Sequence, residues 1–88
     1  MATILAVKTM KLKDKVKKAL EQLPLSGLEV EIERDVGFKV VAVVTSEEFE
    51  GMDRGERQHL VWRKLLDELD EHEQTQVEFV HTMAPSEM

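Results

Sequence analysis

The stretch Val40–Leu69 reads VVAVVTSEEFEGMDRGERQHLVWRKLLDEL, and it decides the fold because it contains the signals for three consecutive elements. It begins with an apolar, β-branched run, which is typical of a strand that is buried on both faces. The following Thr45-Ser46-Glu47-Glu48 has the pattern of a capping box, in which the Thr45 hydroxyl and the Glu48 carboxylate bind amides of the first helical turn. We therefore expect a short helix that ends near Gly51.

A second capping box, Asp53-x-x-Glu56, opens a longer helix. Apolar residues then recur with helical periodicity and predict its buried stripe, which consists of Val61, Trp62, Leu65, Leu66 and Leu69. The stripe fades at Asp70–Glu73. The last expected strand is Thr75–Thr82, with Val77 and Phe79 on one face and with Gln76, Glu78 and Val80 on the other.

The part of the chain before Val40 predicts one helix and one strand. Residues 11–23 carry an apolar stripe with the 3.6-residue period of a helix, formed by Leu12, Val16, Ala19, Leu20 and Leu23. Pro24 and Ser26-Gly27 end that helix. From Leu28 to Glu33 apolar residues alternate with glutamates, which indicates a half-exposed strand. Asp35-Val36-Gly37 is expected to connect it in a hairpin to a second strand, which starts at Phe38.

These elements define a fold class. A strand, a helical crossover and another strand usually form a right-handed parallel unit, so the third strand should lie parallel to the second. The order is helix-strand-strand-helix-helix-strand. We expect an α+β fold in which helices cover one face of a three-stranded mixed sheet, with residues 1–9 as an N-terminal tail and residues 10–88 as a single domain.

Composition narrows the function. The net charge is −6, and the acidic balance makes a nucleic-acid partner unexpected because binding of phosphates needs a basic footprint. The chain has no cysteine, so it supplies neither a thiolate ligand nor a cysteine nucleophile. Its apolar opening, Ala2–Val7, is too short for a membrane span and lacks the features of an export signal. We therefore expect a cytoplasmic protein with no membrane partner. The lysines of residues 11–18 form either a solvated helix face or a surface for an acidic partner.

The segment VTSEEFEG, followed by Arg57 and by Leu60-Val61-Trp62, resembles the BolA-like protein family. That family has the pattern strand, Ser, Phe-x-Gly, Arg-His-Arg, and then a Val-aromatic pair. The tail Ala84–Met88 is similar to the family's terminal Pro-x-Glu-Trp, with Met88 in place of Trp. The resemblance covers about residues 10–88 and implies the element order given above, which is shared with the type II K-homology fold.

The resemblance also implies a function. BolA-like proteins are non-enzymatic partners of monothiol glutaredoxins and share a [2Fe–2S] cluster with them, and some members regulate transcription. The family's strand histidine corresponds to Gln76, and the hairpin contains neither Cys nor His. Because an amide does not replace imidazole as an iron ligand, we expect a divergent adaptor that docks its partner without supplying cluster ligands. The expected partner-binding residues are Gly51, Arg54, Arg57, His59, Gln76 and His81.

Two further hypotheses stay open. The corner from Gly51 to Arg57, with the following helix, occupies the place of the K-homology phosphate loop, although Asp53 works against phosphate binding. The sheet face away from the helices should expose Val41, Val43 and Val80, where a protein partner or a second copy of the chain would bind. We expect no enzymatic activity, no bound cofactor and no metal site, because the histidines have no ligand spacing and Ser46 is a cap residue.

Overall fold

The computed structural model describes residues 11–36 and 39–88, so the predicted tail 1–9 and the turn residues Gly37 and Phe38 lie outside the described part. The elements follow in the order α2 (Leu12–Glu21), β1 (Glu29–Val36), β2 (Lys39–Thr45), the 3-10 helix η1 (Glu47–Gly51), α3 (Arg54–Glu68), α4 (Glu71–Gln76), β3 (Val77–Met83) and the 3-10 helix η2 (Pro85–Glu87). Among these helices, none is both long and apolar enough to cross a membrane.

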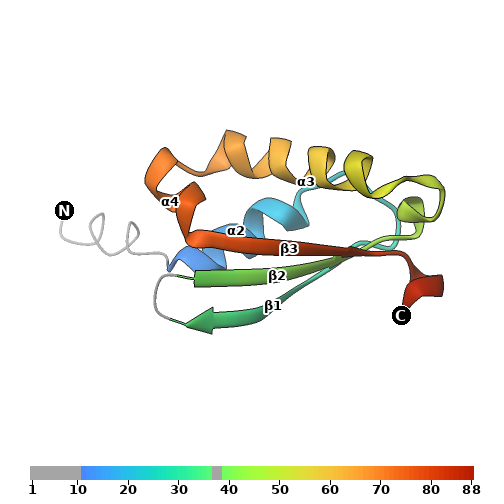
Figure 1. The fold of residues 1–88 in the computed structure, drawn as a ribbon, viewed down its shortest axis with the longest axis horizontal. Helices are drawn as coiled ribbons and strands as arrows, with labels where there is room; N and C mark the ends of the chain where they lie inside the picture. The colour runs from blue at the N-terminus through green and yellow to red at the C-terminus, as the bar shows by residue number, and fades with distance from the viewer. Residues whose placement is uncertain (1–10, 37–38) are drawn as a thin grey trace, which may run out of the picture.

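The sheet has the expected topology. Its order is β1-β2-β3, with β2 antiparallel to β1 and parallel to β3. Both longer helices lie on one side of it, and α3 runs alongside β3 (Figure 1). The prediction of an α+β fold with helices on one face of a three-stranded mixed sheet is confirmed.

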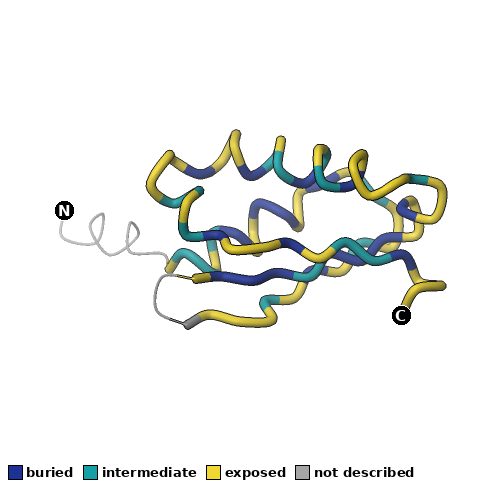
Figure 2. The backbone as a smooth tube through the Cα atoms, in the orientation of Figure 1, coloured by how far each residue is buried: buried dark blue, intermediate teal, exposed yellow. Residues whose placement is uncertain are grey.

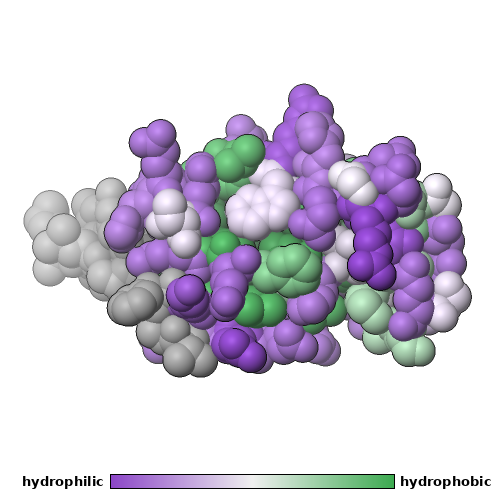
Figure 3. Space-filling model, in the orientation of Figure 1, coloured by the Kyte–Doolittle hydropathy of each residue, from purple (hydrophilic) through white to green (hydrophobic). Residues whose placement is uncertain are grey.

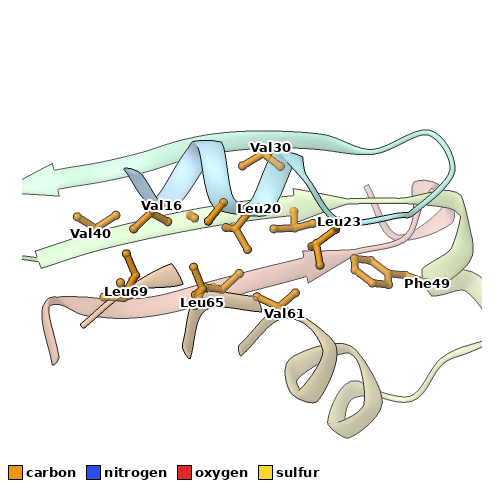
Figure 4. Packing of buried hydrophobic residues seen from close by; sticks show 14 of the residues in the cluster. Val16, Leu20, Leu23, Val30, Val40, Phe49, Val61, Leu65 and Leu69 are labelled. Carbon is orange, nitrogen blue, oxygen red and sulfur yellow. The ribbon is translucent and has the colours of Figure 1, made fainter. Parts of the chain in front are cut away.

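The core lies between the sheet and these two helices. Val16, Leu20 and Leu65 have no exposed surface, and they meet the inner face of β2 at Val40, Ala42 and Val44 (Figure 4). The tube drawn in Figure 2 is buried along most of β2 and mainly exposed along β1. Such burial explains why β2 is almost continuously apolar, whereas β1 alternates between apolar and charged residues.

Several element boundaries differ from the sequence-based expectation, among them the end of α2, which lies at Glu21 instead of residue 23. The strand β1 continues through Asp35 and Val36, which pair with Val40 and Lys39, so the predicted turn starts too early. The segment Glu71–Gln76 forms a separate helix, α4, whose N-cap is Asp70. A reciprocal capping box with Glu73 stabilises α4, in which helical periodicity of apolar residues is absent. Thr75 and Gln76 therefore belong to a helix and not to the last strand.

A β-bulge in β3 reverses the predicted faces from Phe79 onward, while Val77 lies on the inner face. Val77 pairs with Val40, but the next partner of β2, Val41, pairs with Phe79, so Glu78 is the extra residue. Val77 and Val80 consequently both point into the core, and Val80 has no exposed surface. The prediction that Val80 lies on the outer face is wrong, and Phe79, which is 46% exposed, lies there instead.

The first capping box also differs from the prediction. Ser46 is the N-cap of η1, and its hydroxyl accepts a hydrogen bond from the Glu48 amide at 3.1 Å. The Glu48 carboxylate bonds the amide of Ser26 in the turn that follows α2, at 2.6 Å. That turn contains Gly27 with a positive φ of 61°, and an added Cβ would lie 2.9 Å from the Glu47 carboxylate. Thr45 is therefore not the cap of η1.

The buried stripe of α3 also differs from the prediction. Leu66 is 55% exposed and is not part of it.

Candidate partner-binding site

Arg57, one of the residues expected at a docking surface, is only 5% exposed and organises the corner between η1, α3 and the C-terminus. Its guanidinium donates hydrogen bonds to the carbonyl oxygens of Phe49 at 2.6 Å and Thr82 at 3.3 Å, and its Nε donates to Met52 at 3.1 Å. It also lies 5.5 Å from the centre of the Phe49 ring. Arg57 is buried and hydrogen-bonded within the fold, so it presents little surface to a partner, and its assignment as a partner-binding residue stays a prediction.

The C-terminal segment is attached through Arg57. Both carboxylate oxygens of Glu87 accept hydrogen bonds from the guanidinium, at 2.8 and 2.9 Å, and the Ala84 amide donates a third at 2.9 Å. The bonds from Arg57 and then from Ala84 lower the pKa of Glu87 to about 2. The same pairing raises the pKa of Arg57. The terminal Pro-x-Glu pattern thus holds the chain end against η1.

The N-terminus of α3 is closed by its own side chains. Asp53 is the N-cap, and its carboxylate accepts a hydrogen bond from the Glu56 amide at 2.8 Å, while Glu56 binds the Asp53 amide at 3.2 Å. Gly51 is exposed at the preceding corner, and an added Cβ there would meet no atom within 4 Å. Two carboxylates therefore take the positions at which a phosphate would bind a helix N-terminus.

Two of the expected contact residues, Arg54 and His81, line one pocket beside β3. The pocket has a volume of about 270 Å³ and is lined by Arg54, Gln58, Phe79, His81, Thr82 and Met83. The His81 ring packs edge to face with Phe79, with ring centres 4.5 Å apart. In the view of Figure 3, apolar surface gathers over α3 and β3 between polar side chains. This pocket combines two basic side chains with an exposed aromatic ring.

The other expected contact residues lie elsewhere. His59 lines a shallow groove of about 600 Å³ on α3, together with Met52, Glu56, Leu60, Arg63, Lys64 and Asp67. Gln76 is half-buried at the end of α4, and its amide nitrogen lies 3.4 Å from His72 Nε2. The structure thus divides the predicted residues among the η1 corner, the pocket beside β3, the α3 groove and α4.

The outer sheet face is narrower than expected. His81 of β3 reaches across the central strand to Glu33 of β1, with 3.6 Å between imidazole Nε2 and carboxylate. Beneath this pair, Val41 is buried and Val43 is half-buried. Little of the valine surface that was expected to bind a partner or a second copy of the chain is therefore exposed.

Gln58 lines the pocket beside β3 together with Arg54 and His81, and the sequence did not identify it. Its amide nitrogen donates to the carbonyl oxygen of Val80 at 2.8 Å, and its amide oxygen accepts from Trp62 Nε1 at 3.2 Å. The spacing of Gln58 and Trp62 by four residues was the available signal, because such residues share a helix face. Within residues 11–36 and 39–88, no group of three or more His, Cys, Asp or Glu side chains forms a metal site.

Comparison with known proteins identifies the fold. No protein-family model and no curated protein matches the chain. Among solved structures, a Bol-like protein from Babesia bovis is 24% identical, with a TM-score of 0.55 and coverage of 91% of this chain and 92% of that one. BolA1 from Arabidopsis thaliana is 23% identical, with a TM-score of 0.57 and coverage of 90% and 98%. The chain therefore has the fold of these two proteins along nearly its whole length.

Proposed function

We propose that this chain is a non-enzymatic, cytoplasmic adaptor of the BolA-like type that docks a protein partner of the monothiol glutaredoxin class and acts in iron–sulfur or redox-stress handling. The observation that carries the proposal is the shared fold, which extends over at least 90% of this chain and of each of the two solved structures. Phe49-x-Gly51 and Arg57, which resemble the family's pattern, support it, because the Arg57 guanidinium bonds the Phe49 carbonyl oxygen at this corner.

The polar groups that a catalyst would need form hydrogen bonds within the fold, and this supports a non-enzymatic role. The Ser46 hydroxyl is fully buried and bonded to Ser26 and Glu48, so it is not placed to attack a substrate. The buried guanidinium of Arg57 is likewise held by backbone carbonyls and Glu87. These groups stabilise the fold, and the proposed docking role rests on other, exposed residues.

The proposal includes that the chain supplies no cluster ligand. Gln76 stands where the resemblance places the family's histidine, and its side chain ends in an amide at the end of α4. Amides are poor ligands for iron, for which thiolates and imidazoles are preferred. The partner's own ligands would then keep the cluster unchanged after docking.

The test mixes the chain with a monothiol glutaredoxin, with and without its [2Fe–2S] cluster. Calorimetry should detect binding, while visible absorption and circular dichroism of the cluster should stay unchanged. Absence of binding to both forms would refute the docking proposal. A shifted spectrum with the unmodified chain would instead show that one of its histidines ligates the cluster.

A gain-of-ligand variant sharpens this test. Gln76→His should shift the cluster spectrum, whereas Thr75→His, which places imidazole on the adjacent exposed residue, should not. Because His72 lies one helical turn before Gln76, the new pair could bind metal by itself. Gln76→His combined with His72→Ala removes that pair and should retain the shift if residue 76 alone ligates the cluster.

The K-homology alternative is not favoured by the corner's geometry. Asp53 and Glu56 occupy the first turn of α3, and the net charge of −6 leaves few phosphate contacts. We expect an affinity for RNA or DNA weaker than about 10⁻⁵ M at physiological salt, measured by fluorescence anisotropy. Submicromolar binding with a steep salt dependence would establish the nucleic-acid function instead.

A further inference from the structure

We propose that the open edge of β1 binds an extended segment of a protein partner in which basic and apolar residues alternate, and that this segment adds a fourth strand to the sheet. The inference does not depend on whether the partner is a glutaredoxin. It rests on three features of the described residues: the asymmetry of the two sheet edges, a groove beside β1 that apolar and charged side chains line together, and a row of glutamates on the same strand.

The two edges of the sheet differ in how their backbone groups are protected. At β3, side chains of α3 bind the outward carbonyl oxygens, Gln58 at Val80 and Arg57 at Thr82. Within residues 11–36 and 39–88, no side chain forms such a bond with the backbone of β1, which is the other edge of the sheet. The regular part of this edge, residues 29–32, presents alternate amide and carbonyl groups that pair readily with an added strand.

An open groove of about 770 Å³ lies between β1 and the end of α2, on the side of the sheet that the helices cover. Its apolar lining consists of Leu23, Leu25, Leu28 and Val30, and Lys17, Glu21, Glu29 and Glu31 form its polar rim. Side chains of an added strand alternate between the two faces of the sheet. Every second side chain of the partner segment would therefore enter this groove, where apolar residues would contact its leucines and Val30.

The intervening side chains of the added strand would lie on the outer face, beside Glu29, Glu31 and Glu33, of which Glu29 and Glu31 also border the groove at the strand edge. These three glutamates are exposed. Glu29 and Glu31 lie two residues apart on the regular part of β1, roughly 7 Å along the strand, and Glu33 lies at the register shift between Ile32 and Arg34. Only Glu33 has an ion-pair partner among the described residues, His81 at 3.6 Å. Lys or Arg at alternate positions of the partner would match this spacing and sign of charge.

A second copy of the chain is a poor occupant of the same edge. Two β1 strands paired around a twofold axis would bring two glutamate rows together, and like charges on directly opposed strands are destabilising. The charge of the edge therefore selects a basic segment from another protein.

The probe is a capped heptapeptide with alternating Lys and Val, titrated into the full chain and followed by NMR shifts and fluorescence anisotropy. We expect it to bind at least about tenfold more tightly than a Glu-Val peptide. Its lysines would form two or three ion pairs with the glutamates of β1, whereas the glutamates of the other peptide would be repelled. A peptide with the same composition in Lys and Val blocks should bind more weakly than the alternating one. The proposal would be overturned if the block peptide or the Glu-Val peptide bound as tightly as the alternating Lys-Val peptide. It would also be overturned if the alternating peptide did not bind.

Two matched comparisons distinguish strand addition from general charge attraction. N-methylation of the odd or of the even peptide amides should abolish binding in one case only, because alternate amides of a strand point to the sheet. Glu31→Lys should weaken binding about fivefold or more, while Glu78→Lys, the same charge change at the β3 bulge, should leave it within about twofold. Equal effects of the two methylated peptides, or of the two variants, would refute an added strand at β1.

Discussion

Ser46→Ala should destabilise the protein strongly, because one hydroxyl joins two parts of the chain. Ser46 has no exposed surface, its Oγ caps η1 at the Glu48 amide, and it donates to the Ser26 carbonyl at 2.8 Å. Loss of an N-cap costs about 1 kcal/mol. Loss of the second bond adds about 0.5–1 kcal/mol, at the lower end because the Glu47 amide still binds the Ser26 carbonyl at 3.1 Å.

The expected loss in the free energy of unfolding is therefore about 1.5–2 kcal/mol, which corresponds to a decrease in Tm of about 6–16 °C for a domain of this size. Urea unfolding followed by circular dichroism and by Trp62 fluorescence measures it. The matched control is Thr45→Val, since no described residue hydrogen-bonds the Thr45 hydroxyl, and its cost should stay below about 1 kcal/mol. If Thr45→Val costs as much as Ser46→Ala, Thr45 is the cap and the reasoning fails.

Three more predictions concern the C-terminus and β3. Glu87 has a folded pKa of about 2 against an ordinary value of 4.5, so its stabilisation is present above pH 4.5 and is lost as the pH falls toward 2. Glu87→Gln should consequently lose less stability between pH 6 and pH 3 than the unmodified chain does, as measured by urea midpoints. Val80→Ala should lower the free energy of unfolding, measured in urea, by about 2–3 kcal/mol, because Val80 is buried, and Phe79→Ala should lower it by less than about 1 kcal/mol, because Phe79 is exposed. The reverse order would contradict the bulge. Gln58→Ala should speed amide exchange at β3 and destabilise by about 1 kcal/mol, with exposed His59→Ala as the unaffected control.

Most elements could be predicted because their signals are local. The stripe from Leu12 to Leu23 has helical periodicity, and its residues pack on the sheet as that pattern requires. The Asp53-x-x-Glu56 capping box was also read correctly, since both of its hydrogen bonds lie within four residues. The helix α4 was missed because it has no buried residue, and a search for apolar periodicity cannot detect such a helix.

The distribution of the candidate contact residues could not be predicted. Arg57 is charged and lies near exposed residues in the sequence, but its bonds reach from Phe49 to Glu87, which are brought together only by the fold. His81 and Arg54 share a pocket although they are far apart in sequence. Contacts of this kind depend on the packing of α3 against β3, which periodicity does not specify.

The sequence by itself determined the identity of most elements, the central position of β2 and its parallel pairing with β3, because periodicity, apolar content and the handedness of crossovers are local or general rules. Only the tertiary structure decided which side chains of β3 are buried. One extra residue at Glu78 lets both Val77 and Val80 enter the core, and it moves Phe79 and His81 to the outer face. Alternation along an isolated strand cannot reveal such a bulge, since it arises where pairing with β2 and burial against α3 must be satisfied together.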